Sequence, residues 1–232
     1  MVASSFFYAA VAGILPSLVW LFFWLREDTH AQPRSLIAYL FFAGMFSVII
    51  AGFTEKYISD VILDTNIRYA LWAAVEELLK LMVVAIIALH SIQNREPIDV
   101  MIYCIVAALG FAALENTFFI MDPLLNGEVT KGLITGNMRF IGSTLVHIVS
   151  SASIGFAIGY FFYYGRLTKL IATAVGIIVA IGIHFLFNIS ILNATTEQTL
   201  KTFGWIWGGV VLLIILFEEI KAVHIRKLRS GV

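Results

Sequence analysis

Several ionisable and amide side chains of this chain stand inside long apolar stretches, where a membrane helix would have to hold them. A charged side chain at the centre of a membrane helix costs about 2.5–3.5 kcal/mol on insertion scales, so such residues are functional candidates by default. They fall in four consecutive stretches, whereas the other apolar stretches carry almost none away from their ends. In chain order the set is Glu76, Glu77, Lys80, Glu115, Asn116, His147, Ser150, Ser151, His184 and Asn188.

Residues of these types can hydrolyse a peptide bond, which requires an activated water and hydrogen-bond donors for the oxyanion. A glutamate in an apolar environment can be the general base, and Asn188, one helical turn after His184, is a neutral donor suited to an oxyanion. Two histidines with one or two carboxylates equally suit a zinc ion with an open coordination position. The zinc ligands would be drawn from Glu76, Glu115, His147 and His184. The residue types leave the metal-free and the metal-assisted versions open.

Helical spacing gives the two adjacent glutamates different roles. Lys80 lies four residues after Glu76 and three after Glu77, so it can pair with either carboxylate. Successive residues lie about 100° apart around a helix, so both glutamates cannot point at one centre. We expect one glutamate to carry out chemistry and the other to be held by Lys80 as a support. The spacing does not decide which is which.

A serine nucleophile is less well supported by the pattern. Ser150 and Ser151 follow His147 closely, yet no third group is indicated that would orient the histidine toward either hydroxyl. Serines in membrane helices usually pack or form hydrogen bonds between helices. We therefore interpret Ser151, together with Lys80 and Asn116, as a supporting residue.

The elements that must position these side chains are apolar segments. Hydrophobic residues make up 60% of the 232 and charged residues 13%, against about 45–50% and about 25% in soluble domains. This composition predicts an all-α polytopic membrane protein, with one domain over residues 1–232 and a catalytic core at about 67–190. A spanning helix needs about 20 mostly apolar residues. Seven stretches qualify, with the polar site between the third and the sixth: Phe6–Leu25, Leu36–Phe53, Ile67–His90, Ile98–Ile120, Arg139–Tyr164, Lys169–Ser190 and Phe203–Ala222.

Helix direction places the polar residues at a common depth. At a rise of 1.5 Å per residue, the key residues of the four stretches lie roughly 8–14 Å below the same membrane face. These residues are Glu76, Glu115, His147 and His184. Nine basic residues flank the spans on the side of the C-terminus and five flank them on the other side, which predicts a cytoplasmic C-terminus and an outside N-terminus. We also expect a short interfacial helix within Glu55–Asn66.

Other classes of function fit the sequence less well. A net charge of zero gives no electrostatic case for nucleic-acid binding, and the single Cys104 excludes a disulfide within the chain and a thiolate zinc site. The main alternative is a proton- or ion-coupled transporter that uses the Glu and His residues as a relay. Two observations argue against it: these residues are confined to one half of the membrane, and the sequence has no inverted repeat. A haem protein with His147 and His184 as axial ligands would leave the glutamates unexplained. A non-catalytic scaffold is the remaining alternative.

Four short motifs occur in order over Glu76–Asn188. They are Glu-Glu-x-x-Lys at 76–80, Phe-x-x-x-Glu-Asn at 111–116, His-x-x-x-Ser at 147–151 and His-x-x-x-Asn at 184–188. In this order and inside hydrophobic spans they resemble the PrsW family of bacterial intramembrane proteases, which is similar at a distance to the CAAX prenyl endopeptidases and the bacteriocin-immunity membrane proteins.

The resemblance implies a multi-pass protein of the bacterial cell membrane that cleaves a single-span membrane protein, through site-1 cleavage of an anti-sigma factor. It implies that Glu76 is the general base, Glu77 its support and Asn188 the oxyanion donor. The more distant relatives have a histidine where Glu115 stands, so the role of Glu115 carries over least directly. The resemblance leaves open whether the cofactor is none or a divalent metal such as Zn²⁺.

Overall fold

The computed structural model describes residues 2–28, 30–192 and 194–230, and within them it contains helices and no strand. The α-helices are α1 Val2–Trp24, α2 Arg34–Val61, α3 Thr65–Val84, α4 Pro97–Leu125, α5 Val129–Met138, α6 Thr144–Tyr160, α7 Arg166–Ile191 and α8 Thr196–Ser230. A 3₁₀ turn at Leu25–Glu27 (η1) and π-helical turns at Ala85–Leu89 (η2) and Arg139–Ser143 (η3) extend or join them. The predicted all-α class is confirmed.

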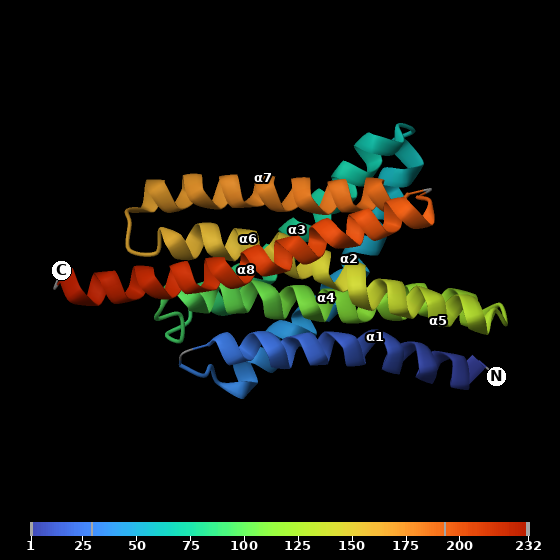
Figure 1. Ribbon diagram of the computed structural model, residues 1–232, viewed down its shortest axis with the longest axis horizontal. Coiled ribbons are helices and arrows are strands. Elements are labelled where there is room, and N and C mark those ends of the chain that lie inside the picture. The colour runs from blue at the N-terminus through green and yellow to red at the C-terminus, as the bar shows by residue number, and fades with distance from the viewer. Residues whose placement is uncertain (1, 29, 193, 231–232) are drawn as a thin grey trace.

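The lengths and compositions of the helices confirm a polytopic membrane protein. Six helical segments of the described chain are long and apolar enough to cross a membrane: 5–27, 34–61, 97–125, 129–160, 166–191 and 196–229. The third predicted span, Ile67–His90, corresponds to α3 and is not among these six; the 20 residues of α3 include Arg68, Glu76, Glu77 and Lys80. Most of these helices run along the long axis of the molecule, with the start of α1 at one end and the end of α8 at the other (Figure 1).

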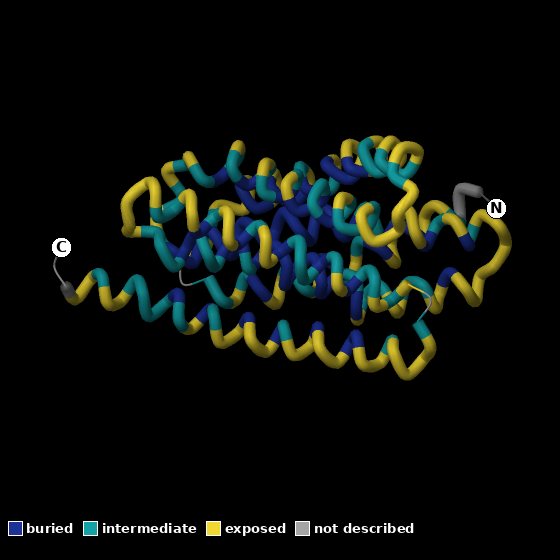
Figure 2. The backbone as a smooth tube through the Cα atoms, turned by 90° about the horizontal axis from the view of Figure 1, so that it is seen from above, coloured by how far each residue is buried: buried dark blue, intermediate teal, exposed yellow. Residues whose placement is uncertain are grey.

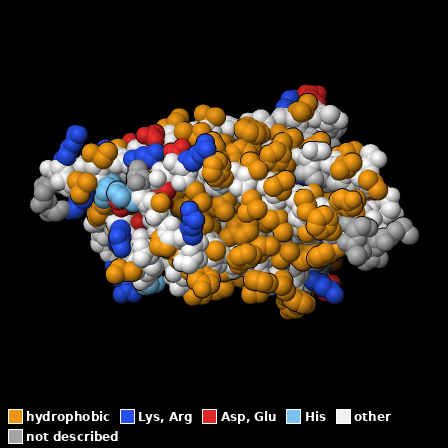
Figure 3. Space-filling model, turned by 90° about the horizontal axis from the view of Figure 1, so that it is seen from below, with side chains coloured by type: hydrophobic (Ala, Val, Ile, Leu, Met, Phe, Trp, Pro, Cys, Tyr) orange, Lys and Arg blue, Asp and Glu red, His pale blue; other side chains and the backbone are white. Residues whose placement is uncertain are grey.

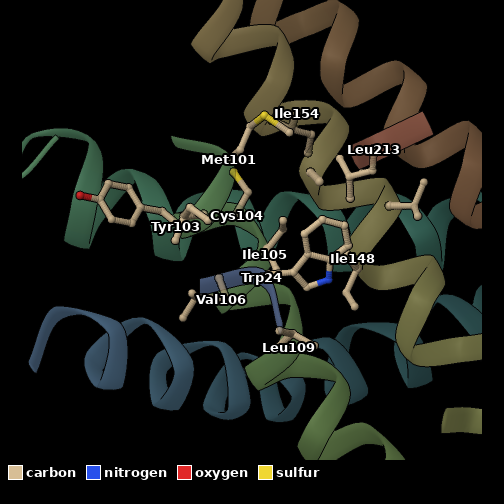
Figure 4. Close-up of a cluster of buried hydrophobic side chains, with 14 of the residues drawn as sticks. Trp24, Met101, Tyr103, Cys104, Ile105, Val106, Leu109, Ile148, Ile154 and Leu213 are labelled. Atoms are coloured by element: carbon tan, nitrogen blue, oxygen red, sulfur yellow. The ribbon is translucent and has the colours of Figure 1, made fainter. Parts of the chain in front are cut away.

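Helix α4 forms the centre of the bundle. Nearly every side chain from Ile98 to Ala113 is buried, and the buried residues gather along the middle of the molecule (Figure 2). In Figure 4, α4 side chains such as Ile105 and Leu109 meet Trp24 of α1 and Ile148 of α6. Because lipid is as apolar as these side chains, tight helix packing depends on close approach.

Glycine permits that close approach between α2 and α4. A Cβ on Gly110 would lie 1.9 Å from the carbonyl oxygen of Phe41, and one on Gly44 would lie 2.2 Å from the carbonyl oxygen of Ala107. Any larger residue at either position would push α2 away from α4. This contact fixes α2, and through the short turn at 62–64 it also places α3.

Local signals explain where the helices of the site begin. The side chain of Asp64 accepts a hydrogen bond from the backbone N–H of Ile67 at 2.9 Å, so it caps the first turn of α3. Pro97 opens α4, and the Asp99 carboxylate accepts the backbone N–H of Glu96 at 2.8 Å. These caps set the register of Glu76 on α3 and of the polar residues on α4.

Some predicted boundaries are wrong. The separate interfacial helix within Glu55–Asn66 does not form, because α2 continues unbroken to Val61 and Asp64 then caps α3. Helix α4 continues past Ile120, where the predicted stretch ends, to Leu125, and Pro123 lies within its last turn. The residues before Arg139 form α5, which runs through η3 into α6 as one long helical segment. Helix α8 continues well past Ala222 to Ser230.

Candidate active site

The polar residues of α3, α4, α6 and α7 meet at one place. Glu76 Oε2 lies 3.7 Å from His147 Nδ1 and 3.7 Å from His184 Nε2. His147 Nε2 lies 3.0 Å from Glu115 Oε2, and the two imidazole rings stand edge to face with centroids 4.9 Å apart. The structure therefore brings together the four side chains that helix depth had placed at one level.

Glu77 is the glutamate whose two carboxylate oxygens both accept hydrogen bonds. Its carboxylate is fully buried and accepts hydrogen bonds from Lys80 Nζ at 2.6 Å, Ser151 Oγ at 2.7 Å and His184 Nδ1 at 2.8 Å. These donors come from three helices, α3, α6 and α7, so Glu77 ties them together. Its oxygens are occupied by these hydrogen bonds, which favours a supporting role over a reacting one.

Glu76 has fewer hydrogen-bond partners than Glu77 among the described residues. It points about 100° away from Glu77 around α3, and it lines a cavity of about 1100 Å³. Its Oε2 is buried yet has no hydrogen-bond partner among the described residues, and Lys80 Nζ lies 3.8 Å away. A buried carboxylate oxygen without a partner is costly. Glu76 is therefore the carboxylate of this site with an unused hydrogen-bond acceptor.

The hydrogen bonds assign the tautomers of both histidines. The Lys80 ammonium can only donate, so His147 Nδ1 accepts from it at 3.0 Å and His147 Nε2–H donates to Glu115. Glu77 is an acceptor, so His184 Nδ1 carries a hydrogen and donates it to Glu77, and His184 Nε2 faces Glu76. A carboxylate behind a histidine in this way fixes the orientation of the ring.

Arg139 is a site residue that the sequence analysis noted only as a basic residue at a helix end. Its guanidinium donates to Glu115 Oε2 and to Asn116 Oδ1, and it lies over the Phe119 ring at 4.0 Å. Asn116 in turn donates to Thr144 Oγ1 at 3.0 Å. Arg139 opens the π-helical turn η3, which directs its side chain toward α4. Its separation of 24 residues from Glu115 hides this pairing from local patterns.

The cavity lies at one end of the bundle. Its walls come from the end of α2, the start of α3, the ends of α4 and α7 and the start of α8, and the C-terminus of α8 lies at the opposite end (Figure 1). Asn188 of α7 lines the cavity together with Glu76, Glu115, His147 and His184. Most of the remaining lining is apolar or aromatic, and Glu55 at the end of α2 is a further carboxylate that sequence reasoning had not selected.

Both serines lie away from a nucleophile's position. Ser151 Oγ donates to Glu77, and Ser150 Oγ is fully buried without a hydrogen-bond partner among the described residues. Neither hydroxyl is bonded to His147, whose two nitrogens face Lys80 and Glu115. The arrangement favours Ser151 as a support of Glu77 and gives Ser150 no part in the site.

Three of the residues have the spacing of a metal site. One donor atom each from Glu76, His147 and His184 lies within 4.8 Å of the other two. Tetrahedral zinc with bonds of about 2.0–2.2 Å places its donors about 3.3–3.6 Å apart, close to the observed 3.7 Å separations. The partnerless Glu76 oxygen and the carboxylate behind His184 also fit. Lys80 competes for the His147 Nδ1 lone pair, and Glu115, named as a possible ligand from the sequence, lies outside this group of three.

Comparison with known proteins agrees with the motifs. The model of the family described as "PrsW family intramembrane metalloprotease" matches residues 32–220. The protein named Protease PrsW from Geobacillus kaustophilus is 27% identical over 152 residues, which are 64% of this chain and 64% of that protein. Its namesake from Halalkalibacterium halodurans is 26% identical over 167 residues, 69% of this chain and 70% of that protein.

The match thus spans just under two thirds of the length of the Geobacillus protein. No solved structure matches this chain. The family model, however, covers well over half of the chain, from the start of α2 to the later part of α8, and it includes all four motifs. This chain belongs to the PrsW family of intramembrane metalloproteases.

Proposed function

We propose that this chain is an intramembrane peptidase that cleaves a membrane-anchored protein, with Glu76 as the residue that activates water. The observation that carries the proposal is the buried Glu76 carboxylate, which lines a cavity of about 1100 Å³ and whose Oε2, without a hydrogen-bond partner among the described residues, stands 3.7 Å from a nitrogen of each histidine. The family membership supports the same class of activity.

The reaction follows from the positions of these groups. A water in the cavity forms a bond to the scissile carbonyl carbon and gives one proton to Glu76. Asn188 donates to the oxyanion that develops on the carbonyl oxygen. When the carbonyl re-forms, the carbon–nitrogen bond breaks and the proton passes from Glu76 to the leaving amine. Glu77 holds His184 and Lys80 in place throughout.

A divalent metal is compatible with the same residues. Glu76, His147 and His184 would hold it, and it would supply Lewis-acid polarisation and a more acidic water. The family description as a metalloprotease supports this version. In either version Glu76 would act on the water, and in the metal version the two imidazoles would complete the set of ligands.

The position and lining of the cavity support the substrate class that we propose. Apolar and aromatic side chains line most of it, and the outer surface of the molecule carries a broad apolar zone with basic side chains gathered toward the C-terminal end (Figure 3). This distribution supports a cytoplasmic C-terminus and a site in the outer half of the bilayer. We propose a single-span protein as the substrate, of the anti-sigma factor type, cut near the outer membrane surface.

The test uses purified full-length protein in liposomes. The substrates are a panel of tagged single-span proteins that includes the anti-sigma factors encoded by the same genome. The panel also includes a reporter with a Leu/Ala helix of about 20 residues and a Gly-Pro pair at its outer end. We expect the wild type to cut at least one panel member near the outer end of its span and Glu76→Gln to cut none, with the bond mapped by mass spectrometry. Cleavage of no panel member, or equal cleavage by both proteins, would contradict the proposal.

A further inference from the structure

One carboxylate of the catalytic cavity has no part in the reaction described above. Glu55 of α2 lines the cavity and is partly buried. Within residues 2–28, 30–192 and 194–230, no hydrogen bond or ion pair joins its carboxylate to another side chain. Its backbone carbonyl, in contrast, accepts the indole N–H of Trp72 on α3 at 3.2 Å. The backbone at Glu55 is thus fixed against α3, while its charge is available to a bound molecule.

The basic side chains near this carboxylate have other partners or face water. Arg139 donates to Glu115, and Lys80 donates to Glu77. Lys56 is exposed and forms no ion pair with any residue that the structure describes. Its long aliphatic stem lets the ammonium group stay in water. The cavity therefore contains an acidic charge that has no ion-pair partner in the described part of the chain.

Three carboxylates face the same hollow. The charge of Glu55 interacts with the charges of Glu76 and Glu115, and all three residues line the cavity. Most of the remaining lining is apolar or aromatic, so charges here are screened less than charges on an open surface. A cationic group that enters is attracted to these carboxylates, and an anionic group is repelled.

The level of Glu55 determines which part of a bound substrate it can contact. Glu55 lies six residues before the end of α2, and Glu76 lies eleven residues after the start of α3. At 1.5 Å per residue, Glu55 is therefore about 7–8 Å closer to the α2–α3 turn than Glu76. The hydrogen bond from Trp72, four residues before Glu76, agrees with this offset. An extended chain rises about 3.3 Å per residue, so the offset spans about two substrate residues.

We propose that Glu55 selects substrates with a lysine or arginine two residues from the scissile bond, on the side of the α2–α3 turn. This inference rests on the proposed peptidase function, which puts the scissile carbonyl beside Glu76. In the proposed topology the α2–α3 turn lies at the outer surface, so the basic residue stands on the outer side of the cut. Glu55 contacts this side chain and takes no part in breaking the peptide bond.

Such a contact discriminates among single-span proteins. Basic residues flank membrane spans mainly on the cytoplasmic side, so a basic residue just beyond the outer end is an uncommon feature. A lysine at this place supplies the cation that Glu55 lacks. A glutamate at the same place meets three carboxylates instead, and this repulsion acts against the wrong substrates.

Asp60 provides a matched control on the same helix. It lies five residues after Glu55, about 140° further around α2, and it is exposed and outside the cavity lining. Glu55→Gln and Asp60→Asn each remove one acidic charge, and Glu55→Lys and Asp60→Lys each reverse one. Size-exclusion chromatography and thermal unfolding check that the variants fold. Glu55→Gln, which keeps the volume of the side chain, is sufficient for the test if Glu55→Lys does not fold.

The kinetic test uses the panel member that the wild type cuts, at the bond mapped by mass spectrometry. The second residue from that bond on the outer side is changed to Lys, Gln or Glu. The third residue is changed in the same way as a control, because adjacent side chains of an extended chain point to opposite sides. At the second position we expect kcat/KM to be about 10-fold or more higher for Lys than for Glu, as a hydrogen bond between charged groups would give. At the third position the ratio should stay within about 3-fold.

The protein variants should change this preference according to their charge. Glu55→Gln should reduce the ratio of Lys to Glu cleavage to within about 3-fold, and Glu55→Lys should invert it. Asp60→Asn and Asp60→Lys should keep the wild-type ratio within about 2-fold. A ratio that Glu55→Gln leaves unchanged, or an equal loss in Asp60→Asn, would overturn the inference. So would a wild type that prefers Glu at the second position, as pairing with Lys56 would produce.

A second test detects the contact without turnover. The Glu76→Gln protein is mixed in liposomes with Gly-Pro reporters that carry one lysine at successive positions beyond the Gly-Pro pair. A carbodiimide then joins carboxylates to amines in direct contact, and labelling by glycine ethyl ester without reporter checks that the reagent reaches Glu55. We expect mass spectrometry to find the reporter lysine joined to Glu55 at one position or at positions two apart, and little joined to Asp60. Lysine joined equally to Glu55 and Asp60, or never to Glu55, would overturn the inference.

The two tests separate this inference from the peptidase function. Adducts at Glu55 without wild-type cleavage of any panel member would refute the peptidase function alone. Cleavage that shows no charge preference at the second position would refute the selection by Glu55 alone.

Discussion

Replacing each of the adjacent glutamates by glutamine should separate chemistry from support. Glu76→Gln keeps the volume of the side chain but removes its charge and its basicity. Because Glu76 Oε2 has no hydrogen-bond partner among the described residues, we expect the unfolding free energy to stay within about 0.5–1 kcal/mol of the wild type. Cleavage should fall by about 10²–10⁴-fold, the usual contribution of a general base.

Glu77→Gln should act mainly on stability. It removes the buried partner of Lys80, bonded at 2.6 Å, and it presents an N–H₂ group to donors on Ser151 and His184. Breaking one side of a buried ion pair costs about 3–5 kcal/mol. At roughly 2–4 °C per kcal/mol for a chain of this length, the unfolding temperature should fall by about 6–20 °C. The double variant Glu77→Gln with Lys80→Met should recover part of this loss, because it removes the ammonium that Glu77→Gln leaves without its hydrogen-bonded carboxylate.

The assay for this pair combines thermal unfolding in detergent, followed by far-ultraviolet circular dichroism, with reporter cleavage in liposomes. Cleavage is compared only among variants that elute as folded protein. Near-normal cleavage by Glu76→Gln would refute the assignment of Glu76 as the residue that activates water. A Glu77→Gln variant that unfolds at the wild-type temperature would refute the supporting role of Glu77.

Three further predictions concern the rest of the site. Asn188→Ala should lower kcat by about 10²–10³-fold with little change in KM, since it removes one oxyanion donor; an unchanged kcat would remove that role. Arg139→Gln should lower the unfolding free energy by about 1.5–3 kcal/mol, the range for hydrogen bonds to charged groups such as Glu115, and Arg139→Lys should lose less. Elemental analysis of zinc-loaded, desalted protein should find about one zinc per chain, with loss of zinc in both His147→Ala and His184→Ala; retention of zinc in both variants would place it elsewhere.

Features of the site that depend on the length, direction or spacing within a single helix could be predicted from the sequence. Apolar length predicted the spans, and the order and direction of the helices predicted that Glu76, His147 and His184 lie at one depth. Helical spacing also predicted that Lys80 holds one glutamate. The choice between the glutamates needed the rotation of α3 about its axis, which the packing of α3 against α2, α4 and α7 determines.

Features that depend on how helices cross were not predictable in this way. Arg139 reaches Glu115 and Asn116 only because the π-helical turn η3 places it beside α4. Glu55 lines the cavity because α2 continues to Val61, past the point where the apolar pattern weakens. Neither the turn nor the continuation leaves a hydrophobic period that could be read from the chain, since both arise from packing between segments far apart in sequence.

The charges around the two histidines explain why Glu76 is the reactive carboxylate in either version of the mechanism. Three carboxylates face them, those of Glu76, Glu77 and Glu115. Lys80 bonds to Glu77 and Arg139 bonds to Glu115, so the described residues offer Glu76 no hydrogen-bonded cation of its own. A buried charge without a partner is costly until it takes up a proton or a cation. A proton from the attacking water and a bound metal ion would both relieve the same imbalance. The arrangement therefore directs both kinds of chemistry to Glu76, which lines the cavity and has a carboxylate oxygen without a hydrogen-bond partner among the described residues.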